Sequence, residues 1–121
     1  MLLVTSNKVK RLLYLSYIGR VRPEDLRRGQ EDIKALLTDL KPGFRQLVDF
    51  GRLESMDLAC RTELGQIMEL ADRSGVGLLV RVIPDPRKDI GLDILSIFHY
   101  RHHPQMVTCK NLAEAVKKLS L

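Results

Sequence analysis

Residues 46–82 constrain the fold more than any other stretch of this 121-residue chain. They begin with a short apolar run, Gln46–Phe50, continue with a helical repeat over Asp57–Ser74, and end with a second apolar run, Leu78–Val82. Apolar residues recur in the middle part at three- and four-residue steps, which places them on one helical face: Leu64, Ile67, Met68 and Ala71. Segments of these lengths predict a helical crossover between two parallel strands.

The residues at the ends of these segments favour the same interpretation. Gly51 follows the first apolar run, where a glycine typically ends a strand. Asp57 precedes the helical repeat, and its carboxylate is placed to accept hydrogen bonds from free amides of the first turn. Gly75 follows the repeat, where helices often end in a left-handed residue. We therefore expect Asp57 to be the N-cap of the central helix and Gly75 its terminator.

The chain before this unit predicts two strands and a helix. Leu2–Thr5 and Val9–Ile18 are apolar runs separated by turn residues, which predicts an antiparallel pair. Gly19 is expected to end the second strand. Pro23 suits the first turn of the helix that follows, and Pro42–Gly43 closes that helix.

The chain after the central unit predicts a helix, a strand and a final helix. Ile90–Tyr100 is an unusually apolar helical segment, and Met106–Cys109 is a short edge strand. Asn111 and Glu114 have the spacing of an N-cap and its partner at the start of the last helix. The predicted order is β-β-α-β-α-β-α-β-α. This order predicts an α/β sandwich in one domain over residues 1–121, with a mostly parallel sheet of about five strands packed with about four helices.

Composition favours a soluble globular protein in a reducing compartment. Hydrophobic residues make up 45% of the chain and charged residues 29%, which is ordinary for such a domain. No apolar run approaches the ~20 residues that a transmembrane helix needs, and the first residues lack the layout of a signal peptide. Two cysteines are too few for a disulfide framework, so we expect a cytoplasmic protein.

The net charge of +5 is unevenly distributed. Residues 1–28 hold seven bases and two acids, residues 81–121 hold seven bases and four acids, and the segment between them is acidic. Basic ends of this kind suit nucleic acid or an anionic membrane surface. However, nucleic-acid binders usually add stacking aromatic residues, and here the three Phe and three Tyr do not alternate with the bases. We expect no nucleic-acid binding and interpret the charge as a solvated surface.

The central stretch resembles the STAS domain, the fold of sulfate-transporter tails and of anti-sigma-factor antagonists. That family places an acid at a strand end, here Asp49, then the motif Asp-Ser-Ser/Thr-Gly, here Asp57–Cys60, and then a Gly-rich turn, here Ser74–Gly77. In phosphorylated members the second Ser or Thr of the motif accepts the phosphate. Ala59 occupies that position here and has no hydroxyl, and Cys60 replaces the motif glycine. The resemblance implies the family's fold without its phosphorylation switch at that position.

A second phrase, Gly19–Asp25, is similar to the SpoIIAA-like branch of the STAS fold. In that branch a strand-ending glycine leads to a Glu-Asp helix start, which a hydroxyl residue often caps. Arg22 occupies the cap position here. Together the two resemblances imply a STAS/SpoIIAA-like sandwich that interacts with a protein partner.

In STAS-like regulators, the loop before the motif helix and the first turn of that helix meet the partner. The resemblance therefore implies a partner-binding loop over Gly51–Leu58, with these candidate contacts: Arg52, Leu53, Glu54, Met56, Asp57 and Leu58. Its mixture of apolar and charged residues is also typical of an interface with a buried centre and a polar rim. The alternative is that Leu53 and Met56 simply hold the loop on the core. Phosphate on Ser55 would restore a switch in this loop.

Asp49 and Cys60 are candidate reactive groups. Asp49 has the position of a phosphoacceptor in receiver domains, but those domains also need an early acidic pair, and here only Thr5–Asn7 stands there. We expect Asp49 to accept backbone amides of the next loop. Cys60 lies near a helix N-terminus, where a thiol pKa can fall. Without a partner Cys or His we interpret Cys60 as a small buried residue.

The three histidines are candidate metal ligands. His99 and His102 are one helical turn apart, with His103 beside them, a spacing that would suit zinc if a helix continued that far. Pro104 breaks such a helix, and no HExxH pattern is present. Histidines at a helix C-terminus also interact favourably with its dipole, which is the interpretation we adopt. We expect no metal and no cofactor.

Two further surfaces are suggested by position. Asp85, Arg87 and Lys88 lie on a loop after a strand, where α/β folds place ligand sites. The segment Ile90–Tyr100 has more apolar residues than one buried stripe requires, including Leu92, Leu95 and Phe98. A surplus of this kind predicts a homodimer through this helix or, as the alternative, a pocket for a small apolar ligand.

The leading functional prediction is a non-enzymatic, regulatory protein–protein interaction module. The alternative is a carrier or sensor of a small apolar ligand or lipid. An enzyme is the weakest hypothesis, because no nucleophile and base can be paired from the sequence.

Overall fold

The computed structural model describes residues 1–85 and 99–121 and confirms the α/β class. Its five-stranded sheet has the order β1-β2-β3-β4-β5, with β1 antiparallel to β2 and every other neighbouring pair parallel. The elements, in chain order, are β1 (Leu2–Asn7), β2 (Leu12–Val21), α1 (Pro23–Leu37), β3 (Arg45–Met56), the 3₁₀ helix η1 (Leu58–Cys60), α2 (Arg61–Arg73), β4 (Leu78–Val82), β5 (Gln105–Cys109) and α4 (Leu112–Leu119). The predicted helix Ile90–Tyr100 lies, up to residue 98, outside the described residues.

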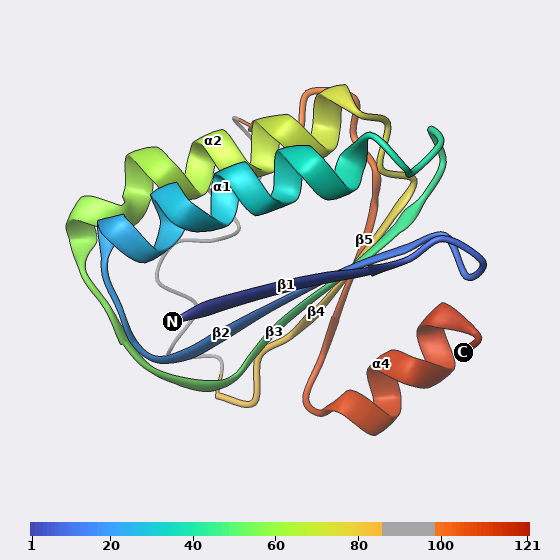
Figure 1. Cartoon of the computed structure of the whole chain (residues 1–121). Helices are drawn as coiled ribbons and strands as arrows, with labels where there is room; N and C mark the ends of the chain where they lie inside the picture. Colours follow the sequence, from blue (N-terminus) through green and yellow to red (C-terminus); the bar gives the residue numbers. More distant parts are fainter. Residues whose placement is uncertain (86–98) are drawn as a thin grey trace.

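Helices cover both faces of the sheet (Figure 1). α1 and α2 lie side by side on one face, joined by Arg27–Glu63 and Gln30–Gln66 contacts of 3.0 and 2.8 Å, and α4 packs on the other face. The larger core lies under α1 and α2 and includes three residues from one face of β2: Leu13, Leu15 and Tyr17. A smaller core lies under α4, where Leu47, Val80 and Leu119 meet. The two cores make the sheet a central layer between helices.

β3 continues well past the point at which β4 ends. β4 ends with Val82 opposite Asp49, whereas β3 runs on to Met56 along β2. Two register shifts each place an extra residue on β3, and such bulges bend and twist a ribbon. The paired segments, residues 17–21 of β2 and 50–56 of β3, are called the β2–β3 extension. Figure 1 shows the extension curving toward the first turns of α1 and α2.

The predicted strand ends at Gly19 and Gly51 were therefore wrong. Gly19 has a φ of +68° at the second bulge, and β2 continues to Val21. Gly51 lies inside β3 at the first bulge rather than in a loop, so the predicted loop Gly51–Leu58 is mostly strand. At both positions the glycine permits a β-bulge, and the pairing of β2 with β3 continues beyond it. The start of β2 was also misplaced, because Lys8–Arg11 form the hairpin loop.

The predicted central helix divides into η1 and α2. Asp57 does occupy the N-cap position of η1, but its side chain makes no capping hydrogen bond. Its carboxylate instead lies 3.8 Å from the Arg20 guanidinium of β2. Gly75 has the predicted left-handed conformation, with a φ of +90°. Asn111 caps α4 as predicted, accepting the Glu114 amide at 2.9 Å.

The start of α1 follows its sequence signals. Pro23 is the first helical residue, and Asp25 supplies the cap by accepting the Arg22 amide at 2.9 Å. The Asp25 side chain thus forms the reciprocal half of a capping box, whereas the Arg22 side chain makes no capping hydrogen bond. No helix in the described residues is long and apolar enough to span a bilayer.

Candidate functional site

The carboxyl ends of the parallel strands gather the predicted partner-binding residues. β2, β3 and β4 all run toward this edge of the sheet, and η1 and the start of α4 lie beside it. In open α/β sheets this is the edge at which ligands and partners bind. The site therefore has to be built from the last residues of β3 onward.

Asp49 anchors this edge by internal hydrogen bonds. Its side chain is only 4% exposed; Oδ1 accepts the Gly51 amide at 2.7 Å and Oδ2 accepts the Tyr14 hydroxyl at 3.3 Å. Burial raises the pKa of the Tyr14 hydroxyl, and the charge of Asp49 raises it further, so the hydroxyl remains a donor at neutral pH. A Cβ on Gly51 would lie 2.9 Å from Oδ1. The predicted structural role of Asp49, accepting a following amide, is confirmed.

The β2–β3 extension buries one residue and exposes its neighbours. Leu53 is 6% exposed and belongs to the larger core, and Met56 is half-buried against it. Arg52 and Glu54 are exposed. The extra residue at each bulge explains this pattern, because it shifts the inward positions from every second to every third residue. Leu53, predicted as a partner contact, is therefore a core residue, as the alternative interpretation of this segment held.

η1 presents an exposed apolar side chain next to the motif position. Leu58 is 71% exposed, and Ala59 beside it is also exposed. Cys60 turns inward, and its Sγ lies 3.7 Å from the Val21 carbonyl oxygen. Burial raises the pKa of the Cys60 thiol, and the carboxylates of Asp57 and Glu63 raise it further. The thiol is therefore protonated at neutral pH, and Cys60 is the small buried residue that the sequence predicted.

A shallow groove of about 260 Å³ runs from this edge to the start of α4. Its lining combines acid, bases and apolar groups: Asp49, Gly51, Arg52, Val82, Pro84, Lys110, Asn111 and Leu112. The last three of these were missed from the sequence. They follow β5, and the adjacency of β4 and β5 is the signal that would have placed them here. Asp85 is half-buried just after β4, whereas Arg87 and Lys88 lie outside the described residues, as do Leu92, Leu95 and Phe98.

Two of the histidines, His99 and His102, bind carboxylates of α2, and the helix whose dipole was expected to act on them lies outside the described residues up to residue 98. His99 Nδ1 lies 2.8 Å from Glu69 Oε1, and His102 Nδ1 lies 2.8 Å from Asp72 Oδ2. The buried Asp72 carboxylate also accepts the backbone amides of Arg101 and His102, at 3.2 and 3.1 Å. These contacts attach the segment after residue 98 to α2. Across residues 1–85 and 99–121, no three His, Cys, Asp or Glu side chains group in a way that could hold a metal ion.

Comparisons with known proteins assign the fold. No family model matches the chain, and no curated protein matches it. An uncharacterized DUF3478-family protein with a SpoIIAA-like fold from Shewanella loihica is similar at 12% identity, with a TM-score of 0.72 over 98% of this chain and 92% of that one. The Bacillus cell fate determinant SpoIIAA in its phosphorylated form is similar at 14% identity, with a TM-score of 0.63 over 98% and 99%.

An anti-sigma factor antagonist from Mycobacterium paratuberculosis is also similar, at 18% identity and a TM-score of 0.59 over 100% of this chain and 94% of that one. Each of these likenesses extends over nearly the whole of both chains. At such low identities they speak to architecture. The chain has the STAS/SpoIIAA-like fold that its sequence motifs predicted.

Proposed function

We propose that this protein is a non-enzymatic interaction module that binds a protein partner through the carboxyl-end surface. That surface is defined by the exposed or half-exposed residues of the extension and η1: Arg52, Glu54, Asp57 and Leu58. Met56, half-buried between them, forms its floor. The proposal treats residues 1–121 as one cytoplasmic domain in which Cys60 and Cys109 remain free thiols.

The observation that carries the proposal is the exposure of Leu58. This side chain is 71% exposed, although the preceding Asp57 and the nearby Cys60 both contact β2. Asp57 lies 3.8 Å from Arg20, and Cys60 is buried against Val21. An exposed apolar side chain next to Asp57, on a segment that also exposes Arg52 and Glu54, has the composition of an interface with an apolar centre and a polar rim. A rigid surface also loses little conformational entropy when a partner binds.

The structural relatives support a regulatory role. Two of them are described as anti-sigma factor antagonists, and SpoIIAA has been solved in phosphorylated and unphosphorylated forms. In this chain the motif position is Ala59, which has no hydroxyl to accept phosphate. We therefore propose binding that is independent of phosphate at position 59. Stoichiometric phosphate on Ser55, found by phosphopeptide mapping, would contradict that part of the proposal.

The chemistry of this edge favours binding over catalysis. Asp49 is engaged by Gly51 and Tyr14, and the buried Cys60 thiol has a raised pKa. Neither group is therefore available as a base or a nucleophile. The ligand-carrier alternative gains no support from the described core, since the cavity between the sheet and α2 measures about 20 Å³. That is the space of about one water molecule.

The test uses the tagged wild-type protein as bait and measures partner recovery quantitatively by mass spectrometry. We expect Leu58→Glu to lower recovery at least tenfold, and Arg52→Glu to weaken binding by ~1–3 kcal/mol with the melting temperature nearly unchanged. Glu54→Lys tests the other sign of charge on the same surface. Val116→Glu is the matched control, because it also places a charge on an exposed apolar residue, but on α4.

The control is expected to recover the same partner in the same amount as wild type. Equal recovery by Leu58→Glu, Arg52→Glu, Glu54→Lys and wild type would show that the carboxyl-end surface is not the one used. Loss of recovery in all variants, Val116→Glu included, would point to a different surface or to general destabilisation, which the melting temperatures distinguish.

A further inference from the structure

Basic side chains gather at the opposite edge of the sheet, where the parallel strands begin. Hydrogen bonds bring three segments together there. The Arg45 amide donates to the Arg11 carbonyl at 2.8 Å, and the Arg45 guanidinium donates to the carbonyls of Lys10 and Leu119. The Arg11 guanidinium donates to the Pro42 carbonyl at 2.7 Å. The hairpin loop, the α1–β3 loop and the end of α4 thus form one basic surface: Lys8, Lys10, Arg11, Lys41, Arg45, Lys117 and Lys118.

The positive charge of this basic surface is almost unneutralised. Both guanidinium groups donate to backbone carbonyls, which satisfy their hydrogen bonds without cancelling their charge. Among residues 1–85 and 99–121, the one ion pair that the surface makes joins Lys8 to Asp39 at 3.7 Å. Both partners of that pair are more than half exposed, so water and salt screen it. A field of one sign therefore faces solvent at this edge.

An apolar side chain projects from the middle of this field. Val9 is 94% exposed at the tip of the β1–β2 hairpin, between Lys8 and Lys10. The loop is held in shape, because the Lys10 amide donates to Asn7 Oδ1 at 3.0 Å and the Arg11 amide to the Lys8 carbonyl at 3.1 Å. Arg11 takes the left-handed conformation that closes the loop, with a φ of +53°. Val9 is thus directed outward by hydrogen bonds.

We propose that this basic surface attaches the protein peripherally to an anionic lipid bilayer. Lys and Arg side chains would lie against the acidic headgroups, and Val9 would enter the boundary between headgroups and acyl chains. A bilayer fits both features at once, because it offers diffuse negative charge together with an apolar layer just below it.

Nucleic acid fits the same residues less well. The segments that form this surface offer no exposed aromatic side chain to stack on bases, since the one aromatic residue among residues 8–11, 38–44 and 115–121 is the fully buried Phe44. The guanidinium groups of Arg11 and Arg45 already donate to backbone carbonyls, so they are not free to bind a phosphate through two parallel hydrogen bonds. The exposed Val9 side chain, between Lys8 and Lys10, would also have no apolar group to contact on a phosphate backbone.

Attachment at this edge leaves the proposed partner surface accessible. In Figure 1 the β1–β2 hairpin lies at the opposite end of the molecule from the start of α2, where η1 is attached. A protein held at a bilayer through Val9 and its basic neighbours would therefore direct Leu58 away from the lipid. The two surfaces can be tested separately.

The test measures co-sedimentation of the purified protein with vesicles of phosphatidylcholine alone and with vesicles in which a third of the lipid is phosphatidylglycerol. We expect binding to the anionic vesicles only, falling steeply as salt is raised. Lys10→Glu/Lys41→Glu should lower the partition coefficient at least tenfold, since each charge near the surface contributes about fivefold. Val9→Ser should lower it about threefold or more, by removing apolar contact.

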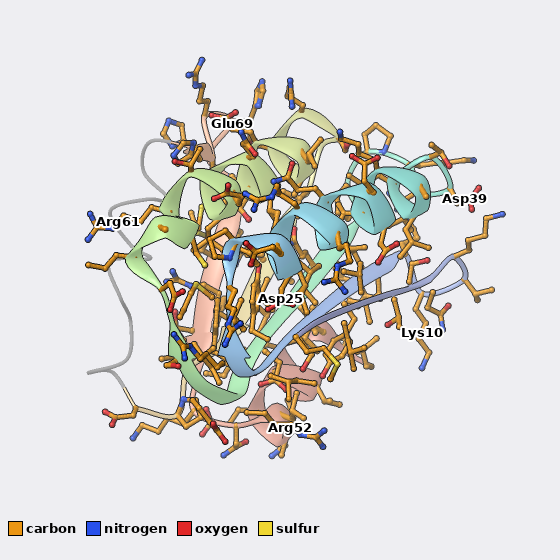
Figure 2. The ribbon with its side chains drawn as sticks, turned by 60° about the vertical axis from the view of Figure 1, so that its left-hand side comes forward. Lys10, Asp25, Asp39, Arg52, Arg61 and Glu69 are labelled. Atoms are coloured by element: carbon orange, nitrogen blue, oxygen red, sulfur yellow. The ribbon has the colours of Figure 1, made fainter. Side chains whose placement is uncertain are left out.

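Arg28→Glu/Arg61→Glu is the matched control, since it changes the net charge by the same amount on exposed residues of α1 and α2. Figure 2 shows Arg61 on the opposite side of the molecule from Lys10. The control should leave partition within about twofold of wild type, because screening limits the reach of distant charges. All variants are compared by circular dichroism and melting temperature.

Three results would overturn the proposal. The first is equal binding to neutral and anionic vesicles, or to neither. The second is an equal loss in the Arg28→Glu/Arg61→Glu control, which would show that net charge alone governs binding. The third is tighter binding to a short DNA or RNA duplex that Lys10→Glu/Lys41→Glu abolishes, which would assign the surface to nucleic acid.

Discussion

The two ends of the parallel sheet use charged residues in different ways. At the carboxyl end, the Asp49 carboxylate is buried and bonded to Gly51 and Tyr14, so its charge serves the fold. At the amino end, Arg11 and Arg45 donate to backbone carbonyls and keep their charge facing outward. The role of a charged residue at a strand end therefore depends on the group to which it is hydrogen-bonded. A bonded carboxylate shapes a surface, whereas a cation on a carbonyl still projects a field.

The backbone differs between the two ends as well. The carboxyl end is built from the β2–β3 extension, whose bulges leave Arg52 and Glu54 exposed on either side of the buried Leu53. The amino end is a tight hairpin loop with Val9 at its tip. One end therefore presents a shaped surface of mixed charge suited to a specific protein, and the other presents a diffuse field of one sign.

The largest expected effect separates the buried leucine from the exposed one at the carboxyl end. Leu53→Ala should lower the free energy of unfolding by ~2–4 kcal/mol, because it leaves a cavity at a position only 6% exposed. Leu58→Ala should change it by less than ~0.5 kcal/mol. Denaturant unfolding of the two variants measures both values. Similar losses in both would contradict the assignment of Leu53 to the core and Leu58 to the surface.

A smaller effect tests whether Asp49 serves the fold. Gly51→Ala should cost ~1–3 kcal/mol, because the new Cβ would lie 2.9 Å from Asp49 Oδ1 and would displace the buried carboxylate from its amide. In an Asp49→Ala background the same substitution should cost much less, since the atom it meets is gone. A double-mutant cycle by denaturant unfolding measures the difference. Additive losses would show that Gly51 is needed for another reason.

The smallest effect compares a bonded carboxylate near the carboxyl end with a screened one at the amino end. The Arg22 amide holds the pKa of Asp25 below its ordinary value, so folding favours the ionised form. Its contribution is complete at neutral pH and is lost as pH falls through the folded-state pKa. Asp25→Asn should therefore cost ~0.5–1 kcal/mol at neutral pH and progressively less in acid.

Asp39→Asn is the counterpart at the amino end. It should cost ~0–0.5 kcal/mol, because the Lys8–Asp39 pair is exposed and screened, and added salt should remove that small cost. Unfolding curves recorded between neutral and acid pH, at low and high salt, compare the two variants. The comparison would be contradicted if salt removed the stability cost of Asp25→Asn and left that of Asp39→Asn unchanged.

Helices and strands with a regular apolar periodicity were predicted correctly from the sequence, whereas irregular backbone such as the β-bulges was not. The antiparallel β1–β2 pair, the parallel β3–β4 pair with its crossover helix, and the Asn111 cap are present as predicted. Each of these depends on local periodicity or on one side chain. The β2–β3 extension was missed because a bulge is decided by the register of a partner strand, and glycines at positions 19 and 51 resemble strand ends.

The candidate site was predicted in part for the same reason. Asp49 and the exposed residues Arg52, Glu54 and Leu58 lie at the expected edge, but Leu53 faces the core because a bulge shifts the alternation. Lys110 and Leu112 reach the edge only through the β4–β5 pairing. The carboxylate partners of His99 and His102 come from α2, thirty residues earlier, and no local pattern joins such distant residues.

The most direct test of the two-surface account is photo-crosslinking in cells, with a photoreactive residue in place of Leu58, Val9 or Val116. We expect the Leu58 position to give a covalent adduct with one distinct protein and the Val9 position to give lipid adducts without a distinct protein. The Val116 position, exposed on α4 beside Lys117, should give no adduct with a distinct protein. The same protein adduct from Leu58 and Val9, or no protein adduct from Leu58, would contradict the account.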